Sequence, residues 1–190
     1  MLDMMDAQRA MDLVRATYNG QYPRLLDANG CDEVFEFLDL PQFTKKFRLT
    51  YNACFKRANN FSEEAHEVVD DVNAFVASDY RNFRRKIYVK NDPSLMWGTL
   101  VHEYIHYLTH RYLYPTCYER GGRWPDLIEG ITEYLTRTTS DDVARIRTSY
   151  NTLYRQVDSY VGGDTSRRQA VMQCCFAGET WKLGALFPPG

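Results

Sequence analysis

Hydrophobic residues recur at helical spacing in three well-separated stretches of the chain. Residues 6–18 place apolar side chains three and four positions apart, which puts them on one side of a helix. That side comprises Ala7, Ala10, Met11, Val14 and Tyr18. Residues 95–112 form an apolar run with the length and composition of a buried helix, and residues 125–138 form an amphipathic one. The pattern therefore predicts helices at the start, in the middle and just beyond the middle of the chain.

The last third of the chain shows the same spacing. Ser140 is a suitable capping residue, and the apolar positions behind it predict one long helix over residues 141–161. Gly162-Gly163 ends that helix, because glycine readily adopts the conformations that terminate helices. A further helix is expected over residues 166–177, with Gly178 as its end. The C-terminal part is thus predicted to be mainly helical.

Shorter apolar stretches before residue 95 predict a small sheet. Residues 46–55 approximate the alternation of a strand, and residues 72–77 and 85–90 read as two more strands. A short helix is expected over residues 61–70. Asp92-Pro93 then predicts the start of the next helix, since aspartate caps a helix and proline suits its first position. In this order the last strand could offer its edge to an extended peptide.

These elements predict an α+β fold in one domain over residues 1–190. A sheet-containing part covers about residues 40–112, and a helical part covers about residues 123–180. Hydrophobic residues make up 44% and charged residues 25% of the chain, which is ordinary for a globular protein with a sizeable core. No internal repeat or linker-like composition divides the sequence.

Charge and apolar length exclude several partner classes. The net charge is −2, so neither nucleic acid nor an anionic membrane is an expected partner. No uninterrupted apolar stretch reaches the length of a membrane span, and acidic residues stand where a signal peptide needs basic ones. The five cysteines match no zinc or disulfide framework, which favours buried free thiols and synthesis in a reducing compartment, with a single disulfide as the alternative. The oligomeric state has no signature in the sequence.

The middle helix carries the chemistry. His102-Glu103-Tyr104-Ile105-His106 matches HExxH, and histidines four apart on a helix lie on one face and can bind a single zinc ion. Glu103 stands beside His102, where its carboxylate can take a proton from a water at that metal. Two histidines at this spacing also occur by coincidence, so the surrounding chain must supply further support.

Two acidic residues in the next predicted helix support a zinc site. Glu129 and Glu133 lie four apart on one side of residues 125–138, where stacked carboxylates repel each other. A zinc site would explain both, because one carboxylate can bind the metal while the other accepts the outer N–H of a ligating histidine. A solvated acidic face is the alternative. Gly130 inside the helix indicates that another backbone or the metal-binding helix packs closely there.

HEYIH followed by LIEGITEYLTR resembles the gluzincin group of zinc metallopeptidases, over about residues 72–137. The resemblance implies a zincin-like fold and one zinc per chain, held by His102, His106 and Glu129. It further implies that Glu103 acts as the general base and that Glu133 supports a ligating histidine. The chain would then hydrolyse peptide bonds of a peptide or protein substrate.

The phrase EGITEYLTR also resembles small bacterial metallopeptidases, some of them attached to secreted toxins. Their closing AYFxGD segment has a divergent counterpart in Cys174-Cys175-Phe176-Ala177-Gly178-Glu179. This likeness implies synthesis in a bacterial cytoplasm, an effector or toxin role, and export by a dedicated secretion system.

Other interpretations remain open. The domain could be an inactive zinc-binding or protein-interaction module, an enzyme that cleaves one specific partner, or a helical domain without metal. Structural zinc sites usually fill their fourth position with Cys or His, and no cysteine here has the spacing to do so. The donor that would stabilise the oxyanion is also open. Candidates are Tyr150, Tyr154 and His110, although packing alone would explain each of them.

Overall fold

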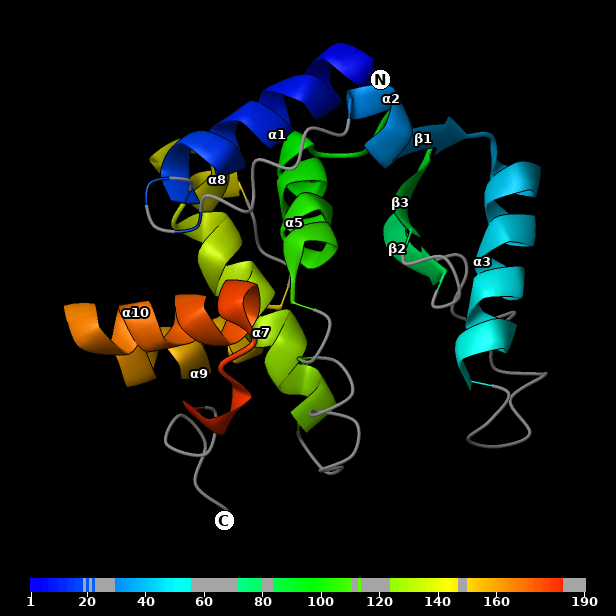
Figure 1. Ribbon diagram of the computed structural model, residues 1–190. Coiled ribbons are helices and arrows are strands. Elements are labelled where there is room, and N and C mark those ends of the chain that lie inside the picture. The colour runs from blue at the N-terminus through cyan, green and yellow to red at the C-terminus, as the bar shows by residue number, and fades with distance from the viewer. Residues whose placement is uncertain are drawn as a thin grey trace. The chain divides into compact units, whose positions relative to one another are not determined.

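The computed structural model describes residues 1–18, 20, 22, 30–55, 72–79, 84–110, 113, 124–146 and 150–182. Within them, helices combine with a three-stranded sheet, which confirms the predicted α+β class (Figure 1). The chain divides into two compact units, Met1–Asp12 with Ala28–Tyr107 and Leu13–Asp27 with Leu108–Gly190. The single metallopeptidase domain over residues 1–190 stays a prediction. None of the helices in the described ranges is long and apolar enough to cross a bilayer.

The first unit is built on the sheet. Strand β1 (Phe35–Leu38) pairs in parallel with β3 (Arg84–Lys90), and β2 (Ala74–Asp79) pairs with β3 in the antiparallel sense. The strands predicted at residues 72–77 and 85–90 are thus confirmed as β2 and β3. β3 is the central strand, paired with β1 along Ile87–Lys90 and with β2 along Arg84–Val89. The expectation that this last strand offers its edge to a peptide is therefore wrong.

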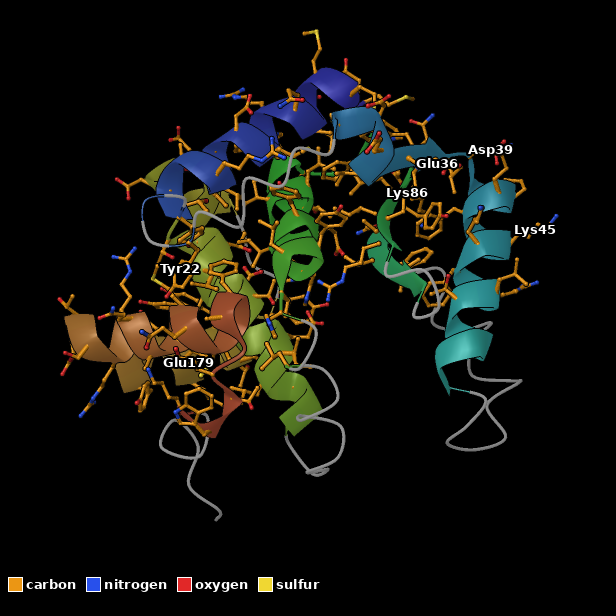
Figure 2. All side chains as sticks on the ribbon, in the orientation of Figure 1. Tyr22, Glu36, Asp39, Lys45, Lys86 and Glu179 are labelled. Atoms are coloured by element: carbon orange, nitrogen blue, oxygen red, sulfur yellow. The ribbon has the colours of Figure 1, made fainter. Side chains whose placement is uncertain are left out.

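Helix α3 (Leu40–Phe55) covers one face of this sheet. The rings of Phe43 and Phe47 each meet the ring of Phe75 edge-on, with ring centroids 5.3 Å apart in both cases. Phe75 in turn contacts Tyr88 of the central strand at 5.4 Å. On the same face, Lys86 and Glu36 form an ion pair of 3.3 Å at its solvent-exposed margin (Figure 2). An aromatic core with a charged margin thus joins α3 to the sheet.

Helix α3 corrects the strand predicted at residues 46–55. The Asp39 carboxylate accepts a hydrogen bond from the backbone N–H of Gln42, which is the pattern of a helix cap. The buried Phe43 and Phe47 are four positions apart, so they make a helical stripe. Leu49, which the strand pattern would have buried, is 60% exposed. The helical spacing of buried residues begins at Phe43, before residues 46–55, in which the strand was predicted.

Helix α5 (Trp97–Leu108) covers the opposite face, so the sheet lies between α3 and α5 (Figure 1). The ring of Tyr104 contacts that of Phe35 on β1 at 6.2 Å. The helix begins later than Asp92-Pro93 predicts. Asp92 instead accepts hydrogen bonds from the backbone N–H and the hydroxyl of Ser94, which closes a local turn. The side chain that could have capped the helix is therefore used before it starts.

The N-terminal helices complete the first unit. Helix α1 (Met4–Tyr18) buries the whole apolar side predicted for residues 6–18, and its first part, up to Asp12, belongs to this unit. Helix α2 (Cys31–Val34) leads directly into β1. The Cys31 thiol lies 3.5 Å from the backbone oxygen of Met4, which ties α2 to the start of α1.

The second unit is helical, as predicted. Its elements are α7 (Trp124–Arg137), α8 (Asp141–Ile146), α9 (Asn151–Val161), α10 (Thr165–Met172), the π-helical turn η2 (Gln173–Ala177) and the short η3 (Thr180–Lys182). Helix α9 packs along α7 and also contacts α10 (Figure 1). The buried Tyr18, at the end of α1, donates a hydrogen bond of 2.6 Å to the backbone oxygen of Leu135 in α7.

One long helix over residues 141–161 is wrong, because the segment forms α8 and α9. Ser140 does cap α8, accepting a hydrogen bond from the Val143 N–H, and Gly162 ends α9 in a left-handed conformation. The helical conformation is interrupted at Tyr150, whose φ of 53° is left-handed. A bulky residue adopts that conformation at a cost of about 1 kcal/mol or more, and it stops a helix from running through. Tyr150 is 45% exposed, so it does not continue the buried stripe that one long helix would need.

Two further predictions concern a short helix and the state of the cysteines. The helix at residues 61–70 lies outside the described residues. Of the cysteines whose side chains the structure describes, Cys31, Cys174 and Cys175 are thiols rather than disulfides, in agreement with the prediction.

Candidate metal centre

The two motif histidines lie side by side on α5. His102 and His106 are 3% and 5% exposed, and their rings meet edge-on with centroids 4.7 Å apart. Their Nε2 atoms are 3.1 Å apart. Two zinc bonds of about 2.0–2.1 Å at a tetrahedral angle would separate their nitrogens by about 3.3–3.4 Å. The pair therefore already has the spacing of two ligands to one ion.

Contacts within the first unit fix the helix that carries this pair. At its start, the Trp97 indole N–H donates to the backbone oxygen of Asp6, and the Arg9 guanidinium lies 5.0 Å from the Trp97 ring. At its end, Arg85 of β3 donates a hydrogen bond of 2.6 Å to the backbone oxygen of Tyr107. A cation that binds the last carbonyls of a helix also complements its dipole. Both ends of the motif helix are thus held.

The predicted acidic residues lie on α7. Glu129 is partly exposed, whereas the side chain of Glu133 is 0% exposed. Glu133 accepts a hydrogen bond of 2.8 Å at Oε1 from Nε of Arg137, one turn further along the helix. For Glu133, this burial contradicts the alternative of a solvated acidic face. Its predicted contact with a ligating histidine stays a prediction.

The structure brings the three predicted ligands within metal-binding distance. Each of His102, His106 and Glu129 offers one ligand atom, and these atoms all lie within 4.8 Å of one another. Two imidazole nitrogens and one carboxylate oxygen form a donor set that suits zinc and other divalent transition metals. This group has three members among the residues that the structure describes.

Glu103 is also on α5, directly after His102, and its side chain is partly exposed. A general base must reach water, so partial exposure directly after a predicted ligand histidine is compatible with the expected role. The role itself stays a prediction.

The three candidates for an oxyanion donor all lie in the second unit, and that role stays a prediction for each of them. The ring of Tyr154 stacks on that of Tyr134 with centroids 6.3 Å apart, and burial, followed by the Asp158 charge, raises the pKa of its hydroxyl. Tyr150 is largely exposed at the start of α9. His110 donates its backbone N–H to the oxygen of Cys175 at 2.7 Å, which fastens the segment after α5 to η2. These contacts describe structural roles within the second unit.

The helical glycine on α7 has a packing explanation. A Cβ on Gly130 would lie 3.0 Å from the backbone oxygen of Leu153 and 3.3 Å from a methyl group of Val157, both on α9. The predicted close approach is therefore confirmed, and the approaching backbone is that of α9.

Gly130→Val is expected to destabilise the chain by about 1–3 kcal/mol, because overpacking against a fixed backbone outweighs the better helix propensity of valine. Chemical denaturation would measure this loss. Gly20→Val is the matched control, because a Cβ on Gly20 would meet no heavy atom of the described residues within 4 Å. Equal stability of the two variants would contradict the close packing of α7 and α9.

Two arginines near the motifs escaped the sequence analysis. Arg85 follows a strand pattern in which its side chain carries no signal. Arg137 did have one, because a glutamate four positions before an arginine is the favoured order for an ion pair on a helix. The sequence analysis assigns Glu133 only to a histidine, so it does not predict the ion pair with Arg137.

In comparisons with known proteins, no family model, curated protein or solved structure matches the chain.

Proposed function

We propose that this chain is a zinc-dependent metallopeptidase of the gluzincin type. The observation that carries the proposal is the approach of one ligand atom each from His102, His106 and Glu129 to within 4.8 Å. Three protein ligands of this kind leave a fourth position for water, which is the arrangement of catalytic rather than structural zinc sites. The HExxH spacing and the downstream glutamate motif support the same assignment.

A zinc ion held by these residues would lower the pKa of a bound water towards about 7 and polarise a peptide carbonyl. Glu103 takes the proton from the attacking water, because it directly follows His102 on α5 and its side chain is not fully buried. The same carboxylate then delivers the proton to the departing amine. His102 and His106 must stay neutral at the nitrogens that bind, and Glu133 would hold one of them in that tautomer.

The substrate in this proposal is a peptide or protein, as the family resemblance implies. An effector or toxin that cleaves one partner belongs to the same proposal. An inactive zinc module is the competing function, and it would bind metal without turnover.

Metal content tests the site itself. The protein purified without added zinc is expected to hold about one zinc per chain, and Glu129→Gln is expected to hold much less. Glutamine keeps the shape of the side chain but loses the charge that favours a cation. Elemental analysis of both proteins gives the ratio directly.

Asp126→Asn is the matched control, because Asp126 lies exposed in the first turn of the same helix. It should keep its full zinc content. Full zinc in Glu129→Gln would reject Glu129 as the third ligand, and no zinc in the unmodified chain would reject the metallopeptidase.

A further inference from the structure

Glu133 is a buried carboxylate with a specific cationic partner. Its side chain is 0% exposed, and Oε1 accepts the hydrogen bond of 2.8 Å from Nε of Arg137. The Arg137 side chain is itself only 9% exposed. A charge without a partner is costly to bury, so the two side chains depend on each other. The pair fixes the plane of the carboxylate, and with it the direction in which Oε2 points.

Helix α9 holds the guanidinium of Arg137 in place. Nη1 of Arg137 donates a hydrogen bond of 2.9 Å to Oδ1 of Asn151, and the guanidinium carbon lies 4.2 Å from the centre of the Tyr154 ring. A planar guanidinium held by an ion pair, an amide and an aromatic face has little freedom to turn. The backbone contact at Gly130 keeps α9 against α7 at the same time.

We infer that Arg137 is a positioning residue of the metal centre, acting through the orientation of Glu133. The inference rests on the proposed function, in which Glu133 accepts the outer N–H of a ligating histidine. Such partners of ligand histidines set the tautomer and direction of the ring, and losing one weakens metal binding by about 10–100-fold. Arg137 extends that support by one more residue, from α9 through the guanidinium to the carboxylate.

A purely structural arginine is the alternative, and a double-mutant cycle separates the two. The chelator-competition affinity for zinc is measured for the unmodified chain, Arg137→Met, Glu133→Gln and the double variant. Arg137→Met is expected to weaken zinc binding by about 10-fold or more in the unmodified background. In the Glu133→Gln background the same change should weaken it by less than about 3-fold, since the carboxylate that it orients is gone.

The cobalt-substituted protein gives a readout that stability alone does not move. The visible absorption of bound Co²⁺ depends on ligand geometry, so Arg137→Met should shift the bands in the same way as Glu133→Gln does. Arg137→Lys keeps the charge and avoids a carboxylate without a cation, so it covers the case in which Arg137→Met does not fold. It is expected to show the same band shift, because an ammonium lacks the fork that fixes the carboxylate plane.

Arg155→Met is the control on α9, because Arg155 is exposed there, and it should leave affinity and spectrum unchanged. Equal losses from Arg137→Met in both backgrounds, or an unchanged cobalt spectrum in Arg137→Lys, would overturn the inference alone. Absence of zinc from the unmodified chain would instead overturn the proposed site, and the positioning role with it.

Discussion

Glu103→Gln is expected to reduce peptide hydrolysis by at least about 10²–10⁴-fold, the usual contribution of a general base. Glutamine has nearly the same shape but cannot accept the proton of the attacking water. Because Glu103 is not one of the three proposed ligands, the variant should keep the same zinc content as the unmodified chain. Cleavage of a peptide library, followed by mass spectrometry, measures the turnover of both proteins.

Glu33→Gln is the matched control for this experiment. Glu33 is exposed in α2, so the same chemical change there should leave turnover unchanged. Circular dichroism and zinc content establish that each variant is folded and loaded. Normal turnover in Glu103→Gln would reject the carboxylate as the base. No turnover on any peptide by the zinc-loaded unmodified chain would favour the inactive module or a single-partner enzyme.

The motif helices were predictable from the sequence because several independent signals agree along each of them. In α5 and α7 an apolar stripe coincides with the residues that carry the chemistry, so element and site follow from the same letters. The strands β2 and β3 were also found, since each is a short apolar run bounded by polar residues. The sequence pattern is sufficient to predict an element when the spacing of its own apolar residues determines which side of it is buried.

What the sequence did not predict depends on contacts between distant segments. The stretch at residues 46–55 alternates like a strand. It is nevertheless helical, and Phe43 and Phe47 on this helix both pack against Phe75 of the sheet. The order of strands in the sheet has the same origin, because pairing partners leave no mark within one strand. Tyr150 interrupts the helix predicted over residues 141–161, although that stretch contains neither glycine nor proline.

The candidate site divides in the same way. Residue type and helical spacing predict His102, Glu103 and His106, and the resemblance to gluzincins implies Glu129. The neighbours that hold these residues did not follow. Asn151 and Tyr154 contact Arg137 from another helix, and no spacing rule relates the two segments. Supporting residues are set by packing between helices, which single-sequence patterns do not encode.

Zinc should stabilise the folded chain strongly, and the effect should depend on His106. A ligand that binds only the native state at about 1,000 times its dissociation constant adds about 4.1 kcal/mol. For a chain of 190 residues, 1 kcal/mol moves the melting temperature by about 2–4 °C, so zinc should raise it by about 8–16 °C. His106→Gln is expected to lose most of this rise, since the remaining two ligands bind the ion far more weakly. Thermal unfolding followed by circular dichroism, with metal-free protein and buffered zinc, measures the shift.

His110→Gln is the decisive control, because it removes a histidine that stands four positions beyond His106 but is outside the three-residue group. Its ring lies where a Cβ on Gly178 would be, so the substitution can change the melting temperature of the metal-free chain. The zinc-induced rise, however, is a difference between two states of the same variant, and it should survive. An equal loss of the rise in both variants would show that zinc acts on the fold at large. A rise that persists in His106→Gln would remove this histidine from the site and leave His102 without its partner, whatever the 3.1 Å between their nitrogens suggests.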